Sequence, residues 1–230
     1  VSGIFTTDPR IEPKAKKLNQ ISYDEMLELA SLGAKVLQNR SVELAKKLNV
    51  NLVTRTSFSN EEGTLITKEE NIMEKPLVSG IALDRNQARV SLMGVVDRPG
   101  IASDIFTKLA NSGVNIDMII QNTAHDGAAN IDFTVPVSDL NDAKSVVDSF
   151  VQSGEIKDSS YNESICKVSI VGVGMKSHTG VAAKAFSTMA KENININMIS
   201  TSEIKVSMVI DEKYAELAVR SLHSAYELDK

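Results

Sequence analysis

Two glycine-containing loops hold the strongest candidates for a ligand-binding site. Each follows an apolar run typical of a strand and precedes a helical pattern, and their sequences are Asp97-Arg98-Pro99-Gly100 and Lys176-Ser177-His178-Thr179-Gly180. A helix start has N–H groups without intrahelical partners and the positive end of the helix dipole, so it favours a carboxylate or a phosphate. The alternative is an ordinary strand-to-helix turn in which glycine supplies backbone freedom. The residues by themselves leave both interpretations open.

Acidic residues lie close to the first of these loops. Asp97 is part of it, and Asp117 follows Asn115-Ile116, where the next strand is expected to begin. A helix start for a carboxylate, with an aspartate nearby for an ammonium group, describes a pocket for an amino acid. Asp97 could equally be a simple N-cap of the helix.

Other candidate chemistry is weaker. Residues 172–180 are glycine-rich after a strand but lack the Gly-Lys-Ser/Thr ending of a phosphate-binding P-loop. Lys35 lies near a predicted helix break, where it is either a surface lysine or a phosphate ligand. The three histidines show no metal-ligand spacing, and no Ser/His/Asp or Cys/His arrangement is visible. Cys166 has no cysteine partner, so we expect a buried thiol in a protein of the reducing cytoplasm.

Composition narrows the function classes. The chain has 230 residues, of which 42% are hydrophobic and 24% charged, enough for a real core in one or two domains. Its net charge of −5 argues against a nucleic-acid partner, which usually meets a basic face. No apolar run approaches the roughly 18 residues that a membrane span needs.

The first 70 residues predict a mixed α/β segment. A strand is expected at Gly3–Thr7, followed by a turn at Asp8-Pro9-Arg10. Ser22 with Glu25 has the capping-box spacing and predicts a helix start. A second helix is expected from Ser41, a strand at 51–56, and a loop at 57–64.

The rest of the chain contains an internal repeat. The stretch that begins at Ala88 parallels the stretch that begins at Cys166, and each predicts the order βαββα, with its second strand starting at Asn-Ile. The first copy has room for a final strand at 159–165, whereas the second ends one strand short. Residues 77–84 form an unpaired strand ahead of the repeats, so we expect them to complete the second copy and to interlock the two modules.

The quoted sequences resemble the C-terminal part of a bacterial aspartokinase over essentially the whole chain. Residues 3–45 and 57–66 resemble the end of the amino-acid-kinase domain, and the repeats resemble paired ACT modules, with MKSHTGVA and ISTSEIKVSMVI in the second. The resemblance implies an α+β fold with two ferredoxin-like βαββαβ ACT domains behind a remnant of an α/β kinase domain. The implied boundaries are 1–70 for the kinase remnant, 71–84 for a linker and strand, 85–164 for the first ACT domain and 165–230 for the second.

The resemblance also implies an activity and its regulation. The parent enzyme transfers the γ-phosphoryl group of ATP, with Mg²⁺, to the side-chain carboxylate of L-aspartate, and lysine or threonine bound to the ACT domains inhibits it. Phe5, Asp8 and Arg10 match the nucleotide pocket near the adenosine, and Lys35 matches a lysine that reaches the phosphates. The family's N-terminal catalytic motif has no counterpart, so we expect Val1 to be a break inside the catalytic domain and the chain alone to be inactive.

Effector-pocket positions of the family fall on both repeats. In the first they are Asp97, Gly100, Ala102, Asn115, Ile116, Asp117 and Gln121. In the second they are Met175, Lys176, Val181, Ala182, Asn195, Ile196, Ser202 and Glu203. We expect a homodimer through the ACT domains and neither a nucleic-acid nor a membrane partner. Two other functions stay open: a non-catalytic amino-acid-sensing subunit, and a structural oligomerisation module.

Overall fold

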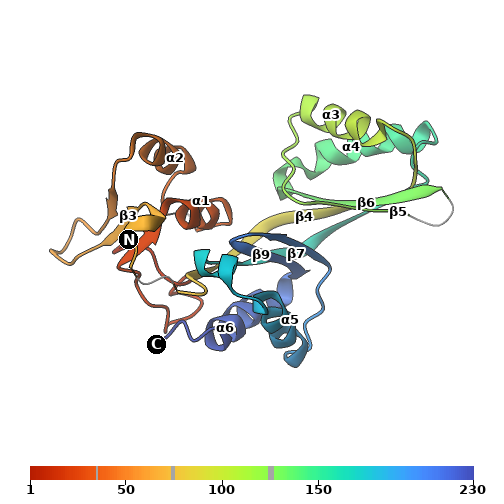
Figure 1. Cartoon of the computed structure of the whole chain (residues 1–230). Coiled ribbons are helices and arrows are strands. Elements are labelled where there is room, and N and C mark those ends of the chain that lie inside the picture. Colours follow the sequence, from red (N-terminus) through yellow and green to blue (C-terminus); the bar gives the residue numbers. More distant parts are fainter. Residues whose placement is uncertain (35, 74–75, 124–126) are drawn as a thin grey trace. The chain divides into compact units, whose positions relative to one another are not determined.

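The computed structural model describes residues 1–34, 36–73, 76–123 and 127–230 (Figure 1). These residues form two compact units. Unit 1 comprises Val1–Asp84 and Lys167–Lys230, and unit 2 comprises Arg85–Cys166. Each unit is described by itself.

Unit 2 has the element order of a ferredoxin-like domain. It contains part of β4 (Gly80–Val96), then α3 (Ile101–Asn111), β5 (Ile119–Thr123), β6 (Ala128–Val135), η2 (Val137–Asp139), α4 (Leu140–Gln152) and part of β7 (Asp158–Val171). The strand order is β5-β6-β4-β7, with β6 antiparallel to both β5 and β4. Both helices cover the same face of this sheet (Figure 1).

The core of unit 2 follows from alternation along its strands. Side chains on one face of β4 and β6 are fully buried against apolar residues of α3 and α4, and Phe133 meets Phe106 edge to face with ring centroids 5.5 Å apart. Each large aliphatic side chain removed from water contributes about 1.5–3 kcal/mol. The main contributors are Val90, Leu92, Ile131, Phe133, Ile105, Leu109 and Val147.

Unit 1 contains the second repeat. After the end of β7 come η3 (Val173–Ser177), α5 (Val181–Lys191), β8 (Met198–Ser202), β9 (Lys205–Asp211), η4 (Glu212–Tyr214) and α6 (Ala215–Ala225). The strand order here is β4-β7-β9-β8. Residues 80–84 of β4 belong to this unit, and the N–H of Ser79 donates to the carbonyl of Val171 at 2.8 Å. The segment 77–84 therefore leads into a strand that lies beside the first strand of the second repeat.

The first 71 residues of unit 1 build a small separate sheet. Its elements are β1 (Gln20–Ser22), α1 (Tyr23–Ser31), α2 (Asn39–Leu48), β2 (Leu52–Thr54), β3 (Thr64–Thr67) and η1 (Glu69–Asn71). The strand order is β1-β3-β2, with β1 parallel and β2 antiparallel to β3. The capping box at Ser22 and Glu25 is confirmed, because each side chain bonds the other residue's backbone N–H.

Several local predictions were wrong. Instead of a strand at Gly3–Thr7 there is one isolated bridge, Phe5 to Lys17, because the chain turns directly afterwards and two following N–H groups return to the Asp8 carbonyl. The second strands of the two repeats start at Ile119 and Met198 rather than at Asn115 and Asn195. In the first repeat the N–H of Asn115 instead donates to the Asp139 carboxylate at 3.0 Å. Strands β1 and β3 were missed, since three or four residues are too few to show an alternating pattern.

Candidate functional site

The predicted nucleotide residues lie on the segment that opens unit 1. Thr6 anchors this segment: its N–H donates to the Lys16 carbonyl at 2.9 Å, and its carbonyl accepts from the N–H of Ile81 at 2.7 Å. Phe5 is half-buried beside it. The segment is therefore tied both to the chain that follows it and to β4.

Asp8 and Arg10 form a tight pair at the turn. The guanidinium of Arg10 donates to both carboxylate oxygens of Asp8, with Nη2 2.7 Å from Oδ2 and Nε 3.0 Å from Oδ1. These hydrogen bonds lower the pKa of Asp8, and the backbone N–H of Arg10 adds to the effect. Arg10 itself is largely exposed, so its side chain is open to solvent while it pairs with Asp8 at the turn.

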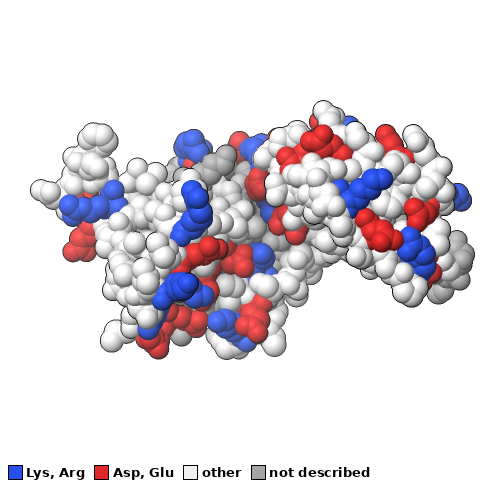
Figure 2. All heavy atoms as spheres, turned by 90° about the horizontal axis from the view of Figure 1, so that it is seen from above, with Lys and Arg blue, Asp and Glu red and all other residues white. Residues whose placement is uncertain are grey.

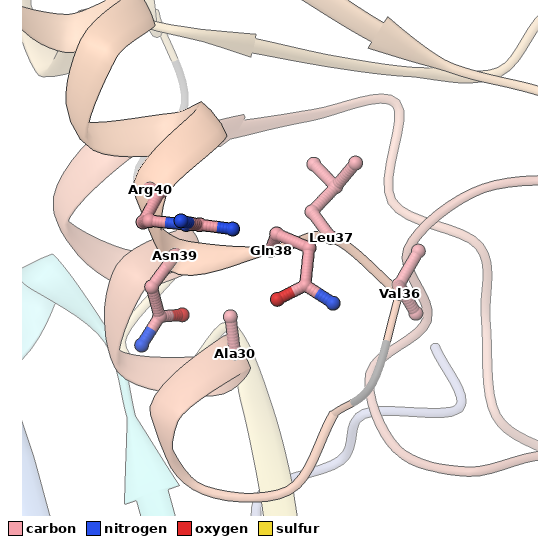
Figure 3. A pocket seen from close by; sticks show the side chains of 6 residues that line it. All are labelled: Ala30, Val36, Leu37, Gln38, Asn39 and Arg40. Atoms are coloured by element: carbon pink, nitrogen blue, oxygen red, sulfur yellow. The ribbon is translucent and has the colours of Figure 1, made fainter.

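A polar hollow lies between the end of α1 and the start of α2 (Figure 3). Its volume is about 330 Å³, and the amides of Gln38 and Asn39 and the guanidinium of Arg40 lie beside Ala30. Gln38 is the N-cap residue of α2, but its side chain makes no hydrogen bond to the first turn of the helix. Lys35, the candidate phosphate ligand, precedes this lining in the sequence but lies outside the described residues.

In unit 2 the structure brings the predicted effector residues to the start of α3 and to the edge strand β5. Gly100 is the N-cap of α3, with φ of 94°, in the left-handed region that glycine tolerates best. Asp97 is exposed and is not the N-cap, so that alternative is wrong. Ala102 lies in the first turn of α3, and Gln121 is exposed on β5.

The segment between α3 and β5 holds the remaining residues of this set. Asn115 is fixed by the carboxylate of Asp139, which accepts from both its backbone N–H and its side-chain amide. These hydrogen bonds lower the pKa of Asp139. Ile116 is half-buried against the unit 2 core, and the N–H of Asp117 donates to the carbonyl of Thr134 at 3.1 Å while its side chain is exposed.

Unit 1 places the second set in equivalent positions. Gly180 is the N-cap of α5 with φ of 89°, and again no side chain caps the helix. Val181 and Ala182 open α5; the Val181 carbonyl accepts a hydrogen bond from Tyr226 at 2.7 Å. Burial raises the pKa of Tyr226 to about 12, so its hydroxyl stays a donor. The other members are Met175 and Lys176 in η3, Asn195 and Ile196 before β8, Ser202 at the end of β8 and Glu203 in the turn to β9.

The predicted set is therefore divided between the units, one helix start to each. Lys176 is held within unit 1 by an ion pair of 3.1 Å with Glu69, which holds the pKa of Lys176 above its usual value. Sequence reasoning missed Asp139, Glu69 and the hollow's Arg40. Asp139 alone carried a sequence signal, since an aspartate just before a helical pattern often bonds to neighbouring backbone N–H groups.

Charge on the face shown in Figure 2 is mixed. In the face shown in Figure 2, acidic and basic side chains alternate over short distances. Arg98 illustrates the pattern, because it bridges Asp104 and Glu155 with both N···O distances at 2.7 Å. None of the helices in the described parts of the chain has the length and apolar character of a membrane span.

Comparison with known proteins accounts for every part of the chain. The ACT domain model matches residues 89–153 and 168–226, and the amino acid kinase family model matches residues 1–54. The aspartokinase of Helicobacter pylori is 61% identical over 234 residues, which cover all of this chain and 57% of that protein. A crystal structure of aspartokinase alpha and beta subunits is 49% identical, with a TM-score of 0.62, over 65% of this chain and 99% of that chain. The chain belongs to the aspartokinase family.

Aspartokinase structures also confirm the fold class. Escherichia coli aspartokinase III in complex with aspartate and ADP, in its R-state, is 25% identical, with a TM-score of 0.83, over 98% of this chain and 50% of that one. The same enzyme with lysine and aspartate, in its T-state, gives 26% identity and a TM-score of 0.78 over 97% of this chain and 49% of that one. This chain spans about half the length of the full aspartokinases that it matches.

Proposed function

We propose that this chain is the C-terminal part of an aspartokinase, in which residues 1–70 complete the ATP site and residues 85–230 form a feedback sensor for lysine or threonine. The observation that carries the proposal is the presence, in one chain, of a kinase-family segment at 1–54 and two ACT repeats behind it. We place the domain boundaries at 70, 84 and 164.

The nucleotide part rests on the first segment of unit 1. Phe5 offers an apolar side chain for the adenosine, and Asp8 with Arg10 shapes the turn beside it. At the hollow, Arg40 and the start of α2 present positive charge, which offsets the charge that develops during phosphoryl transfer. We assign Lys35 to the same role. In the described parts of the chain no three His, Cys, Asp or Glu side chains group to hold a metal ion, so no step here is assigned to Mg²⁺.

The sensor part rests on the two matching helix starts. An amino acid carries one carboxylate, which the uncapped first turn of α3 favours, and one ammonium group, which the exposed carboxylates of Asp97 and Asp117 favour. We assign selection of the side chain to Gln121, which is exposed on the edge strand. The second set, around α5, supplies the equivalent groups in unit 1.

The outer strands support a homodimer through the ACT domains. Ile119 on β5 is 53% exposed, and Ile199, at the equivalent position on β8, is 41% exposed. Among the described residues each strand lies at an end of its sheet and so has an unpaired edge, which proteins usually cover. A cytoplasmic location remains our expectation for such a dimer.

Calorimetry of the chain with lysine, threonine and methionine, each separately, tests the sensor. We expect one of them to bind, and Asp117→Ala or Gln121→Ala to weaken that binding about tenfold or more, the equivalent of about 1.4 kcal/mol. Asp148→Ala, an exposed aspartate on α4, is the matched control and should bind normally. Absence of binding to all three would favour a purely structural module.

Aspartate-dependent formation of ADP tests the kinase part. We expect none from residues 1–230 alone, and activity when the portion of the H. pylori aspartokinase ahead of the matched region is joined to Val1. Robust activity of the chain alone would contradict the proposal.

A regulatory subunit is the second candidate, because the matched alpha and beta subunit structure is almost wholly covered by this chain. Effector binding without activity in the joined protein would favour it.

A further inference from the structure

The side chain of Glu25 is a buried carboxylate with no role in the functions proposed above. It is 2% exposed, at the third position of α1. Its Oε2 accepts from the N–H of Ser22 at 3.1 Å and from the hydroxyl at 2.6 Å. Its Oε1 accepts from the hydroxyl of Ser79 at 2.5 Å and from the N–H of Val173 at 2.9 Å. Because a carboxylate offers about four acceptor sites, these hydrogen bonds satisfy it.

The donors come from three separate segments of unit 1. Ser22 caps the same helix, whereas Ser79 leads into β4 and Val173 opens η3 of the second repeat. A capping box explains only the bonds to Ser22. A buried carboxylate that loses a donor is left partly unpaired, which is costly, so the positions of these three segments depend on one another.

The segment that begins at Val173 carries two of the proposed effector residues, Met175 and Lys176. It packs tightly against residues 76–78: a Cβ at Gly172 would clash with the carbonyl of Leu77. A ligand that contacts Met175 and Lys176 therefore lies within three residues of Val173, whose N–H donates to Glu25.

On its other side Glu25 is part of the helix that the kinase segment contributes. Met26 and Leu29 of α1 are buried in one cluster with Ala82 of β4 and Val171 of β7. One turn after Glu25, the carboxylate of Glu28 forms an ion pair with Lys205 of β9, with Nζ 2.8 Å from Oε2. The helix ends at Ser31, just after Ala30, which lines the polar hollow.

We infer that Glu25 is a positioning residue that couples η3 of the second repeat to helix α1 of the kinase segment, through the hydrogen bond from the N–H of Val173. This inference rests on the proposed effector role of Met175 and Lys176. A ligand that favours a different position of η3 changes this bond, and α1 responds because its buried carboxylate must regain a partner. A ligand can shift such an equilibrium only by its difference in affinity for the two arrangements.

Hydrogen exchange of the full 230-residue chain tests the coupling, with lysine and threonine as separate probes at saturating concentration. In the unmodified chain we expect the probe that binds to change exchange of the α1 amides, residues 23–31, at least about fivefold, the lower end of ordinary allosteric coupling. In Glu25→Gln the change should fall below about twofold, while calorimetry gives a Kd within about threefold of the unmodified value. A merely structural role for Glu25 would leave the ligand-induced change intact.

Two further variants separate the donors. Val173→Pro removes the N–H of η3 and keeps the carboxylate of Glu25, while it also replaces the buried side chain of Val173. Proline is tolerated in the first turn of a helix, and we expect the same loss of coupling. Ser79→Ala removes the other donor to the same oxygen and is the matched control, so it should keep the ligand-induced change. Should Glu25→Gln fail to fold, Val173→Pro decides the question. Normal coupling in Val173→Pro overturns the inference, and failure of both probes to bind the unmodified chain overturns the effector function on which it rests.

Discussion

The long strand β4 serves both units, and truncating one side chain in each of its halves should destabilise only the unit that contains it. Ile81 is 3% exposed in unit 1, and Leu92 is 1% exposed in unit 2. Ile81→Ala and Leu92→Ala each remove three aliphatic carbons, which at about 0.8 kcal/mol per carbon give a transfer loss of about 2.4 kcal/mol. The cavity left behind brings the expected loss to about 2–5 kcal/mol in each unit.

Hydrogen exchange read separately over α6 and α4 measures the two effects. A loss of 3 kcal/mol corresponds to a rise of about a hundredfold in exchange through unfolding. We expect Ile81→Ala to accelerate the amides of α6 in unit 1 by this factor and those of α4 in unit 2 by less than about threefold. Leu92→Ala should do the reverse.

The pair of variants is its own control, because both lie on one strand and remove the same number of carbons. Equal acceleration of α4 and α6 by Ile81→Ala would contradict this prediction, since it would mean that residues 80–84 stabilise the first repeat as much as the second. Removal of residues 77–84 should likewise lower the stability of the second repeat more than that of the first.

Two further predictions concern single residues. The imidazole of His223 on α6 is buried, with Nε2 2.9 Å from the hydroxyl of Thr6, and burial lowers its pKa. The contribution of the neutral imidazole to stability is thus complete above the unfolded pKa of about 6.5 and is lost as the pH falls. Urea unfolding of unit 1 should show a fall in the free energy of unfolding between pH 7.5 and 5.5, and His223→Gln should reduce that fall. An equal fall in both proteins would contradict this. Gly100→Ala and Gly180→Ala should each lower the free energy of unfolding of their own unit by about 1–2 kcal/mol, because both φ angles are positive. A clash adds little, since the added Cβ would meet only Arg98 at 3.9 Å at Gly100 and nothing within 4 Å at Gly180. A loss in Tm only at Gly100 would show that the repeats differ there.

The main elements of the fold could be predicted because their signals are local or repeated. The capping box at Ser22 and the helical patterns each lie within a short stretch. The duplication is visible because the stretch that begins at Cys166 repeats the one that begins at Ala88. The start of β5 could not be predicted, because Asn115 is held by Asp139 from a different element. The short strands β1 and β3 exist through pairing with each other, and pairing between distant segments leaves no periodicity in either.

The candidate sites divide in the same way. The glycines at the two helix starts were found from the sequence, since a left-handed residue at a strand-to-helix turn favours glycine whatever surrounds it. The N-cap role of Asp97 was wrong because Gly100 takes that position. Arg40 and its hollow were missed, since a concave surface arises only when α1 and α2 pack together.

Residue type and order along the chain were enough to give the aspartokinase resemblance, the two repeated modules and the residues that open their helices. What those residues contact depends on how distant segments come together in the folded chain. Glu25 appears in the sequence as a helix cap, yet Ser79 and Val173, from distant segments, complete its four hydrogen bonds. A buried carboxylate must be satisfied by whatever segments surround it, and the fold alone brings those segments together.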